Sequence, residues 1–168
     1  LINQKGIVRA DSAVAGENGT IILKATRDVT LDAASVTTAN GPGGGRVTVQ
    51  SDSGTTLVAG SVEATGSAAA GGTVQLLGNH VGLIDQARVN VSGATGGGTV
   101  LVGGDYQGRN SDIQNAAATY VGGNVQISAD AGESGAGGKV IVWSDDATRF
   151  YGAASARGGA RSGDGGLV

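Results

Sequence analysis

The sequence predicts an all-β protein that folds as a right-handed parallel β-helix, or β-solenoid, with about six coils of three short strands each. Three observations lead to this fold. A Gly-Gly pair (Asn-Gly in the first instance) recurs at steps of 26, 27, 26, 40 and 28 residues, each time two residues before an aliphatic residue. Apolar and other residues alternate after each pair, and glycine is about three times as frequent as in an average protein. A period in this range is typical of solenoids, in which each coil stacks on the one before.

The first strand of each coil is predicted directly after the glycine pair. Its apolar positions form two columns in repeat register: Ile21, Val47, Val74, Val100, Val140 and Val168, and two residues on Leu23, Val49, Leu76, Val102 and Val142. Alternation with a period of two indicates a strand with one buried face. We expect the glycine pair itself to form a tight corner that needs a positive φ and leaves no room for a Cβ atom.

Two more strands complete each predicted coil. A weaker middle strand, whose phase the pattern leaves open, is marked by Val29 with Leu31, Leu57 with Val58, Leu83 with Ile84, and Phe150. A third strand is predicted from the columns Val8, Val36, Val62, Val89, Val125, Ala154 and Ala10, Thr38, Ala64, Val91, Ile127, Ala156. Each aliphatic side chain that such ladders bury fully contributes roughly 1.5–3 kcal/mol to stability.

The single step of 40 residues indicates an insertion. Residues 104–118, GDYQGRNSDIQNAAA, add about half a turn to the fourth coil. Insertions into solenoids form surface loops that often belong to a binding face. This loop carries Tyr106 and Arg109, which are residue types enriched at recognition sites. The alternative is a loop that only covers a corner.

Composition excludes several classes of function. The net charge is −3 and no stripe of basic residues is present, so we expect no nucleic-acid partner. No apolar stretch approaches the ~20 residues that cross a bilayer, so we expect no membrane insertion. The absence of cysteine excludes disulfides and thiolate metal sites.

Two segments carry a family resemblance. GGTVQLLGNHVGLIDQARVNVSG and VIVWSDDATRFYGAASARGG resemble the repeat body of filamentous haemagglutinin-like exoproteins of bacterial two-partner secretion. The resemblance implies that residues 1–168 are a single segment of a longer, extracellular β-helical fibre at the bacterial cell surface. It also implies an outer-membrane secretion pore partner and adhesion to a host-cell, matrix or polysaccharide surface. The Asn-Pro-Asn-Gly-like motif of the family's N-terminal secretion domain does not occur, because the only proline is Pro42.

Repeat register also predicts a column of polar residues at one corner. It contains Asp52, Asn79, Asp105 and Asp145, with Asp146 and Arg149 close by. Two carboxylates on neighbouring coils, about 5 Å apart, repel each other, and a bound Ca²⁺ would relieve the repulsion. Asp105 and Asp145 are therefore candidate metal ligands. The alternative is that Asp and Asn occupy corners because their side chains bond nearby backbone N–H groups.

The remaining candidate binding residues are aromatic or basic. Trp143, Arg149 and Tyr151 lie in the second resembling segment, where the aromatic rings could stack on a sugar; packing at a coil junction is the alternative. The sequence contains no Ser-His-Asp set and no P-loop, so we expect no catalysis and no cofactor besides Ca²⁺. Two other functions remain open: a lyase-like, polysaccharide-active enzyme, and a filament subunit that stacks end to end.

Overall fold

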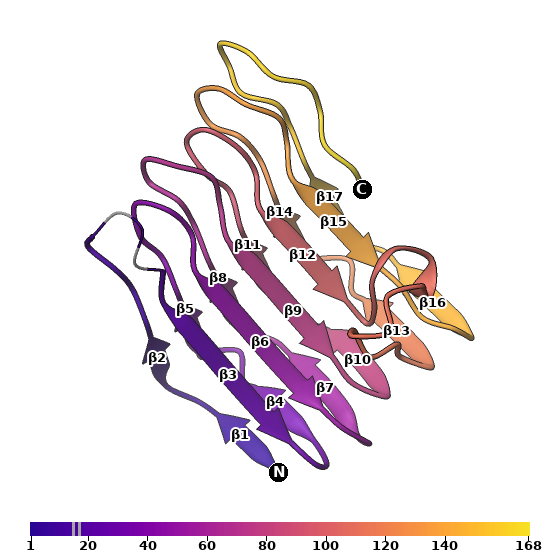
Figure 1. Cartoon of the computed structure of the whole chain (residues 1–168). Coiled ribbons are helices and arrows are strands. Elements are labelled where there is room, and N and C mark those ends of the chain that lie inside the picture. Colours follow the sequence, from indigo (N-terminus) through magenta and orange to yellow (C-terminus); the bar gives the residue numbers. More distant parts are fainter. Residues whose placement is uncertain (15, 17) are drawn as a thin grey trace.

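The chain forms a parallel β-solenoid in the computed structural model, which describes residues 1–14, 16 and 18–168 (Figure 1). Among these residues there are two six-stranded sheets and one five-stranded sheet, here named sheets A, B and C. Successive strands go to sheets A, B and C in turn, and each strand pairs in parallel with its equivalents in the neighbouring coils. This confirms the predicted solenoid with three strands per coil.

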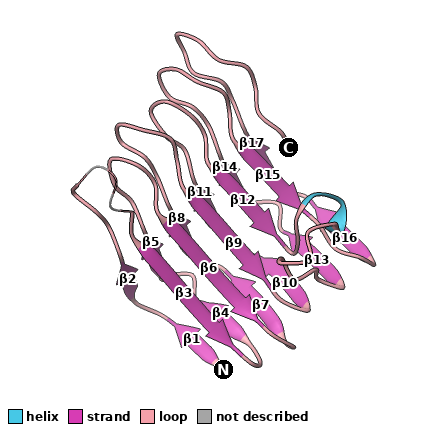
Figure 2. Ribbon diagram, viewed as in Figure 1, coloured by secondary structure: helices cyan, strands magenta, loops and turns pink. Residues whose placement is uncertain are grey.

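The strands are short, as Figure 2 shows. Sheet A contains β1 (Ile2–Gln4), β4 (Val29–Leu31), β7 (Thr55–Val58), β10 (His80–Leu83), β13 (Ala118–Val121) and β16 (Ala147–Phe150). Sheet B contains β2 (Ile7–Arg9), β5 (Val36–Thr38), β8 (Ser61–Glu63), β11 (Arg88–Asn90), β14 (Gln126–Ser128) and β17 (Ala153–Ser155). Sheet C contains β3 (Thr20–Ala25), β6 (Arg46–Ser51), β9 (Thr73–Leu77), β12 (Thr99–Val102) and β15 (Lys139–Val142). One 3₁₀ turn, η1 (Tyr106–Gly108), lies in the insertion, and no helix of the described residues is long and apolar enough to cross a bilayer.

The inward columns of sheet C are those that the sequence predicts. Val47 pairs with Val74, and Val100 with Val140, so that one aliphatic ladder continues from coil to coil. Val47, Val74 and Val100 are completely buried. The strand is easy to recognise because both of its inward positions are aliphatic in every coil.

Sheet A has a weaker pattern because threonine occupies part of its inward face. One inward column contains Val29, Thr56, Val81, Thr119 and Thr148. The buried hydroxyl groups are satisfied: Thr56 Oγ1 donates to the carbonyl of Leu77 at 2.6 Å, and Thr119 Oγ1 to that of Trp143 at 2.8 Å. A threonine whose hydroxyl group bonds the neighbouring backbone therefore fits the core. Because threonine is polar, however, it interrupts the alternation of apolar and polar residues that shows which residues of a strand face inward.

The predicted third-strand register is wrong at two coils. The inward column of sheet B runs through Val8, Thr37, Val62, Val89, Ile127 and Ala154. Val36 and Val125 do not belong to it. Thr37 is completely buried and donates to Gln4 Oε1 at 3.0 Å. The prediction fails because the corner lengths differ between coils, so a fixed count from the glycine pair does not reach the same place in each coil.

The structure confirms one part of the prediction for the glycine pairs and contradicts the other: there is no room for a Cβ atom at the second glycine, but the predicted positive φ does not occur. No glycine of these pairs has a positive φ. Instead, the second glycines of successive coils lie directly on one another. A Cβ atom on Gly72 would be 2.0 Å from the carbonyl oxygen of Gly45, and one on Gly98 would be 2.1 Å from that of Gly72. The pairs therefore permit close approach of the backbones between coils.

A ladder of polar side chains connects successive coils at the corner after sheet B. Asp11 Oδ1 accepts a hydrogen bond from the backbone N–H of Asn40 at 2.8 Å, and Asn40 Oδ1 from that of Thr65 at 2.8 Å. Asp130 Oδ1 accepts from the N–H of Arg157 at 2.7 Å. Each bond satisfies a backbone donor beyond the end of a strand, where sheet pairing stops.

The link at Asp130 should make stability depend on pH. Burial raises the pKa of this carboxyl, but hydrogen bonds from Arg157 and Ser155 outweigh burial, and the net pKa is lowered. A carboxylate whose pKa is lowered by folding stabilises the protein above its unfolded pKa of about 3.9, and this contribution is lost as pH falls through the folded value. We expect Asp130→Asn to lower the free energy of unfolding by about 1 kcal/mol near pH 7, and the difference from wild type to shrink as pH falls below the unfolded pKa and through the lower folded value.

Urea unfolding at several pH values tests this expectation. Asp146→Asn is the matched control, because the side chain of Asp146 is exposed. A difference between Asp130→Asn and wild type that stays constant from neutral to acid pH would contradict the prediction.

Candidate functional site

The insertion lies between β12 and β13 and folds over the corner between sheets C and A (Figure 2). It is bonded to coils on both sides of its own. Asp105 Oδ1 lies 3.2 Å from Lys139 Nζ on β15. In the other direction, Gln114 Nε2 donates to the carbonyl of Asp52 at 3.1 Å, and Gln50 Nε2 on β6 donates to Gln114 Oε1 at 3.0 Å. We call residues 103–117 the strap, because they connect β15 to β6, three strands away in sheet C.

Trp143 lies half-buried beneath the strap. Its Nε1 donates to Asp145 Oδ1 at 3.0 Å, and Asn115 Nδ2 donates to the same oxygen at 3.2 Å. The strap lies close against the indole at two glycines with positive φ: a Cβ atom on Gly104 would be 2.8 Å from Cδ1, and one on Gly108 would be 2.8 Å from Nε1. The structure therefore places Trp143 in the packing beneath the strap.

The two candidate metal ligands have different partners. Asp105 accepts hydrogen bonds from the N–H of Tyr106 at 2.7 Å and from Asn110 Nδ2 at 2.9 Å, besides its contact with Lys139. The bond from Asn110 and then that from Tyr106 lower the pKa of Asp105 below its ordinary value. Asp145 is bound by the indole and by Asn115. The described residues contain no cluster of three or more His, Asp or Glu side chains arranged to hold a metal ion.

Asp105→Ala should loosen the strap without unfolding the solenoid. The carboxylate bonds both ends of the first turn of the strap and a lysine of the next coil, and one such charged hydrogen bond contributes about 1.5–3 kcal/mol. The chain has one tryptophan, Trp143, so its fluorescence reports the strap directly. We expect a red-shifted emission and stronger quenching by acrylamide. Asp112→Ala, which removes an exposed carboxylate of the same strap, is the control; equal quenching in both variants would refute the anchoring role of Asp105.

Tyr106 and Arg109 lie on the outer side of the strap. Tyr106 is 53% exposed and Arg109 is also exposed. Among the described residues, neither side chain forms an ion pair or a side-chain hydrogen bond. The structure therefore leaves both candidate binding residues accessible, on an element that two neighbouring parts of the solenoid hold in place.

Arg149 and Tyr151 lie on a different surface, the outer face of sheet A. There the structure adds Tyr120, which sequence reasoning missed, and His80, the first residue of β10. Tyr120 pairs with Arg149 on the next strand, and its ring lies 5.9 Å from that of Tyr151, tilted by 55°. A hollow of about 400 Å³ on this face is bordered by Thr55, His80, Gly82, Ala118, Tyr120 and Arg149. We call it the sheet A groove.

A signal for Tyr120 is present in the sequence. The dipeptide Ala118-Thr119 recurs as Ala147-Thr148, and the two pair in register in the structure. Aligning the two dipeptides would have placed Tyr120 beside Arg149. The signal was missed because the threonines left the phase of this strand undetermined.

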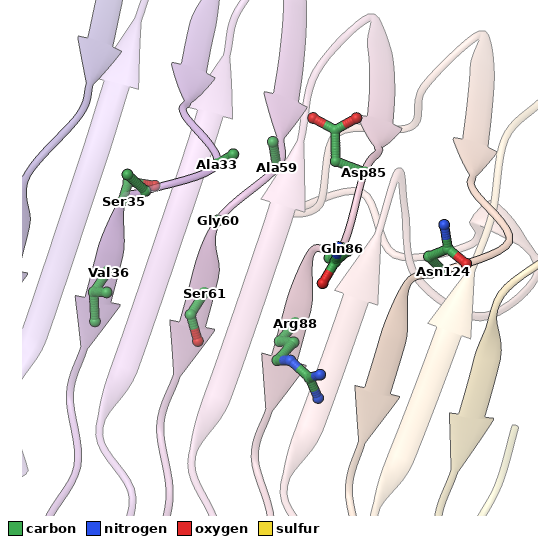
Figure 3. A pocket seen from close by; sticks show the side chains of 11 residues that line it. Ala33, Ser35, Val36, Ala59, Gly60, Ser61, Asp85, Gln86, Arg88 and Asn124 are labelled. Atoms are coloured by element: carbon green, nitrogen blue, oxygen red, sulfur yellow. The ribbon is translucent and has the colours of Figure 1, made fainter.

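A second hollow of about 680 Å³ lies at the corner between sheets A and B (Figure 3). It forms because the corner between β7 and β8 contains only Ala59 and Gly60, whereas residues 32–35 and 84–87 form longer corners on either side. Its polar side chains do not converge: Asp85 points away from Arg88 in Figure 3, and Arg88 Nη1 donates to Gln126 Oε1. We therefore do not place the functional site here.

Comparisons with known proteins agree with the fold. No protein-family model and no curated protein matches the chain. A solved structure does. The chain is similar in fold to the HMW1 secretion domain of Haemophilus influenzae. The TM-score is 0.59 at 20% sequence identity, and the match covers 98% of this chain and 57% of the HMW1 domain.

The similarity to the HMW1 secretion domain shows a shared architecture. At 20% identity it carries no residue-by-residue correspondence, and the chain spans little more than half of the HMW1 domain. From the sequence we predict the repeat body of a secreted fibre, whereas the structural match is to a secretion domain. The match confirms the fold alone.

Proposed function

We propose that this chain is a structural and adhesive section of a secreted β-helical fibre at the bacterial cell surface, of the two-partner secretion type. The observation that carries the proposal is the uninterrupted stacking of the coils: each sheet continues from β1 to β16, from β2 to β17 and from β3 to β15 without a break. Such a stack is a stiff rod whose length grows by about 4.8 Å per coil. It holds side chains on its outer faces at fixed spacings and at a distance from whatever anchors it.

Two exposed surfaces support the adhesive part of the proposal. The strap displays Tyr106 and Arg109, and the sheet A groove displays Tyr120 and Arg149. Tyrosine and arginine are enriched among residues that dominate binding energy at protein interfaces. The likeness to a secretion domain supports export of the chain. The proposal therefore includes an outer-membrane pore partner through which the chain is secreted.

In this proposal the chain has no catalytic activity and needs no cofactor, Ca²⁺ included. Incubation with pectic and other acidic polysaccharides should release neither unsaturated uronates nor new reducing ends. Product formation that exceeds a buffer control would favour the lyase-like alternative and would overturn this part of the proposal.

Adhesion can be measured with microspheres that carry the purified chain at a defined density. We expect such beads to be retained under flow on at least one of three surfaces: an epithelial cell layer, an extracellular-matrix film or a polysaccharide film. Beads that carry the Gly98→Ala variant, which we expect to be unfolded, are the control. Equal retention of both bead types on all three surfaces would refute an adhesive function.

A further inference from the structure

We infer that the sheet A groove binds a uronate-containing oligosaccharide, with the guanidinium of Arg149 on the sugar carboxylate and the ring of Tyr120 against the sugar. This inference rests on the proposed adhesive function and names the partner that the fibre would hold. It is carried by the shape of the groove, by its charge and by the aromatic residues at its edge.

The groove is elongated along the fibre axis. Thr55, His80 and Ala118 form one row across three neighbouring strands of sheet A, and Gly82 and Tyr120 belong to the row beside it. Neighbouring strands lie about 4.8 Å apart, so the four strands from β7 to β16 span roughly 14 Å. Small residues form the floor of the groove, which leaves room for a linear ligand that lies along the stack.

The position of Gly82 explains why the groove is open. Gly82 lies between Leu57 on β7 and Tyr120 on β13, where every larger residue would project outward. A Cβ atom there would be 2.9 Å from Leu57 Cδ1, so even alanine would push Leu57 aside. The gap that glycine leaves is flanked on one side by an apolar side chain and on the other by a phenol ring.

The charge of the groove is opposite to that of the chain as a whole. The net charge of the protein is −3, yet no carboxylate of the described residues borders the groove, whereas Arg149 does. Among the described residues Arg149 forms no ion pair. An arginine with open donors binds a carboxylate through two parallel N–H···O bonds. His80 also borders the groove, with its Nδ1 atom 3.3 Å from Asn79 Nδ2.

The aromatic edge of the groove fits a sugar ring. Tyr120 is 43% exposed and Tyr151 is 63% exposed, and their rings support each other at 5.9 Å. A phenol ring has an apolar face for the C–H groups of a sugar and a hydroxyl group for its oxygens. A ligand with both a carboxylate and an apolar ring face therefore matches what Arg149 and Tyr120 offer together.

Titration of the chain with trigalacturonate, followed by amide chemical shifts, tests the inference. The methyl-esterified trisaccharide is the ligand control, because it has the same shape without the negative charges. We expect saturable shifts on β10, β13 and β16. Arg149→Ala should weaken Kd about tenfold or more, and Tyr120→Ala about fivefold. Arg109→Ala and Tyr106→Ala remove the same residue types from the strap, so we expect them to change Kd less than about twofold.

Several results would overturn the inference: no saturable shifts with trigalacturonate, equal affinity for the methyl ester, or equal losses in Arg149→Ala and Arg109→Ala. Arg149→Lys, which keeps the charge but not the paired donors, should bind with intermediate affinity, and it provides a second variant if Arg149→Ala is unfolded. Beads that adhere although trigalacturonate does not bind would refute the inference alone. Beads that fail to adhere although trigalacturonate binds would refute the proposed function alone.

Discussion

Gly98→Ala is expected to prevent the chain from folding into the solenoid. The added Cβ atom would lie 2.1 Å from the carbonyl oxygen of Gly72 in the preceding coil. The contact is between backbones, so no side-chain rotation relieves it, and the two coils must separate. Separation would break the ladder between β9 and β12 at its start, next to the bond from the N–H of Thr99 to the carbonyl of Gly72. We expect a loss of about 3 kcal/mol or more, seen as a large fall in the urea midpoint or as unfolded protein.

Gly96→Ala is the control for this prediction, because it places the same methyl group two residues earlier in the same buried corner. The added Cβ atom would meet its closest neighbour, the Cβ atom of Ala70, at 3.5 Å, which is an ordinary contact. Replacing such a glycine often stabilises a protein by about 0.4–1 kcal/mol, because the unfolded chain loses freedom. Similar midpoints for Gly96→Ala and Gly98→Ala would show that the stacked glycines are not needed for close approach.

Leu76→Ala is expected to lower the free energy of unfolding by about 2–5 kcal/mol. Leu76 is completely buried and lies in the inward column of sheet C, between Val49 on β6 and Val102 on β12. Truncation removes the burial of the side chain and leaves a cavity. The neighbouring coils cannot collapse to fill it, because their spacing is set by backbone hydrogen bonds. Urea unfolding followed by circular dichroism measures the loss.

Ile22→Ala provides the comparison for Leu76→Ala. Ile22 lies on β3 of the same sheet but faces outward and is 64% exposed. Removing it should change stability by less than about 0.5 kcal/mol. Equal losses of unfolding free energy in the two variants would mean that the residues of the inward column do not contribute more to stability than the exposed ones.

The sequence alone was sufficient to predict the solenoid architecture and the residues of sheet C that face the core. The recurring glycine pair sets the length of a coil, and the residues after it are aliphatic at both inward positions, so Val74 and Val100 are recognised as core by pattern alone. The insertion could also be located, because a step of 40 residues stands out against steps of 26–28. These features are local, since they depend only on residues within one coil.

The register of the other two sheets was decided by the tertiary structure. Corners of different length precede β5, β8 and β14. The number of residues that follow the glycine pair therefore does not show that Thr37, rather than Val36, faces the core. Buried threonines add to the difficulty, because a hydroxyl that bonds a neighbouring carbonyl is as well accommodated as a valine.

The candidate site was likewise assembled by stacking. Tyr120 and Arg149 are 29 positions apart in the sequence and become neighbours only because β13 pairs with β16. Asp105 and Asp145, predicted to share one corner, bind different partners because the strap turns Asp105 toward Lys139. The sequence by itself determined how long each coil is and which face of sheet C is buried. Which outer residues meet was decided by the tertiary structure, because contacts between coils depend on the length of every corner between them.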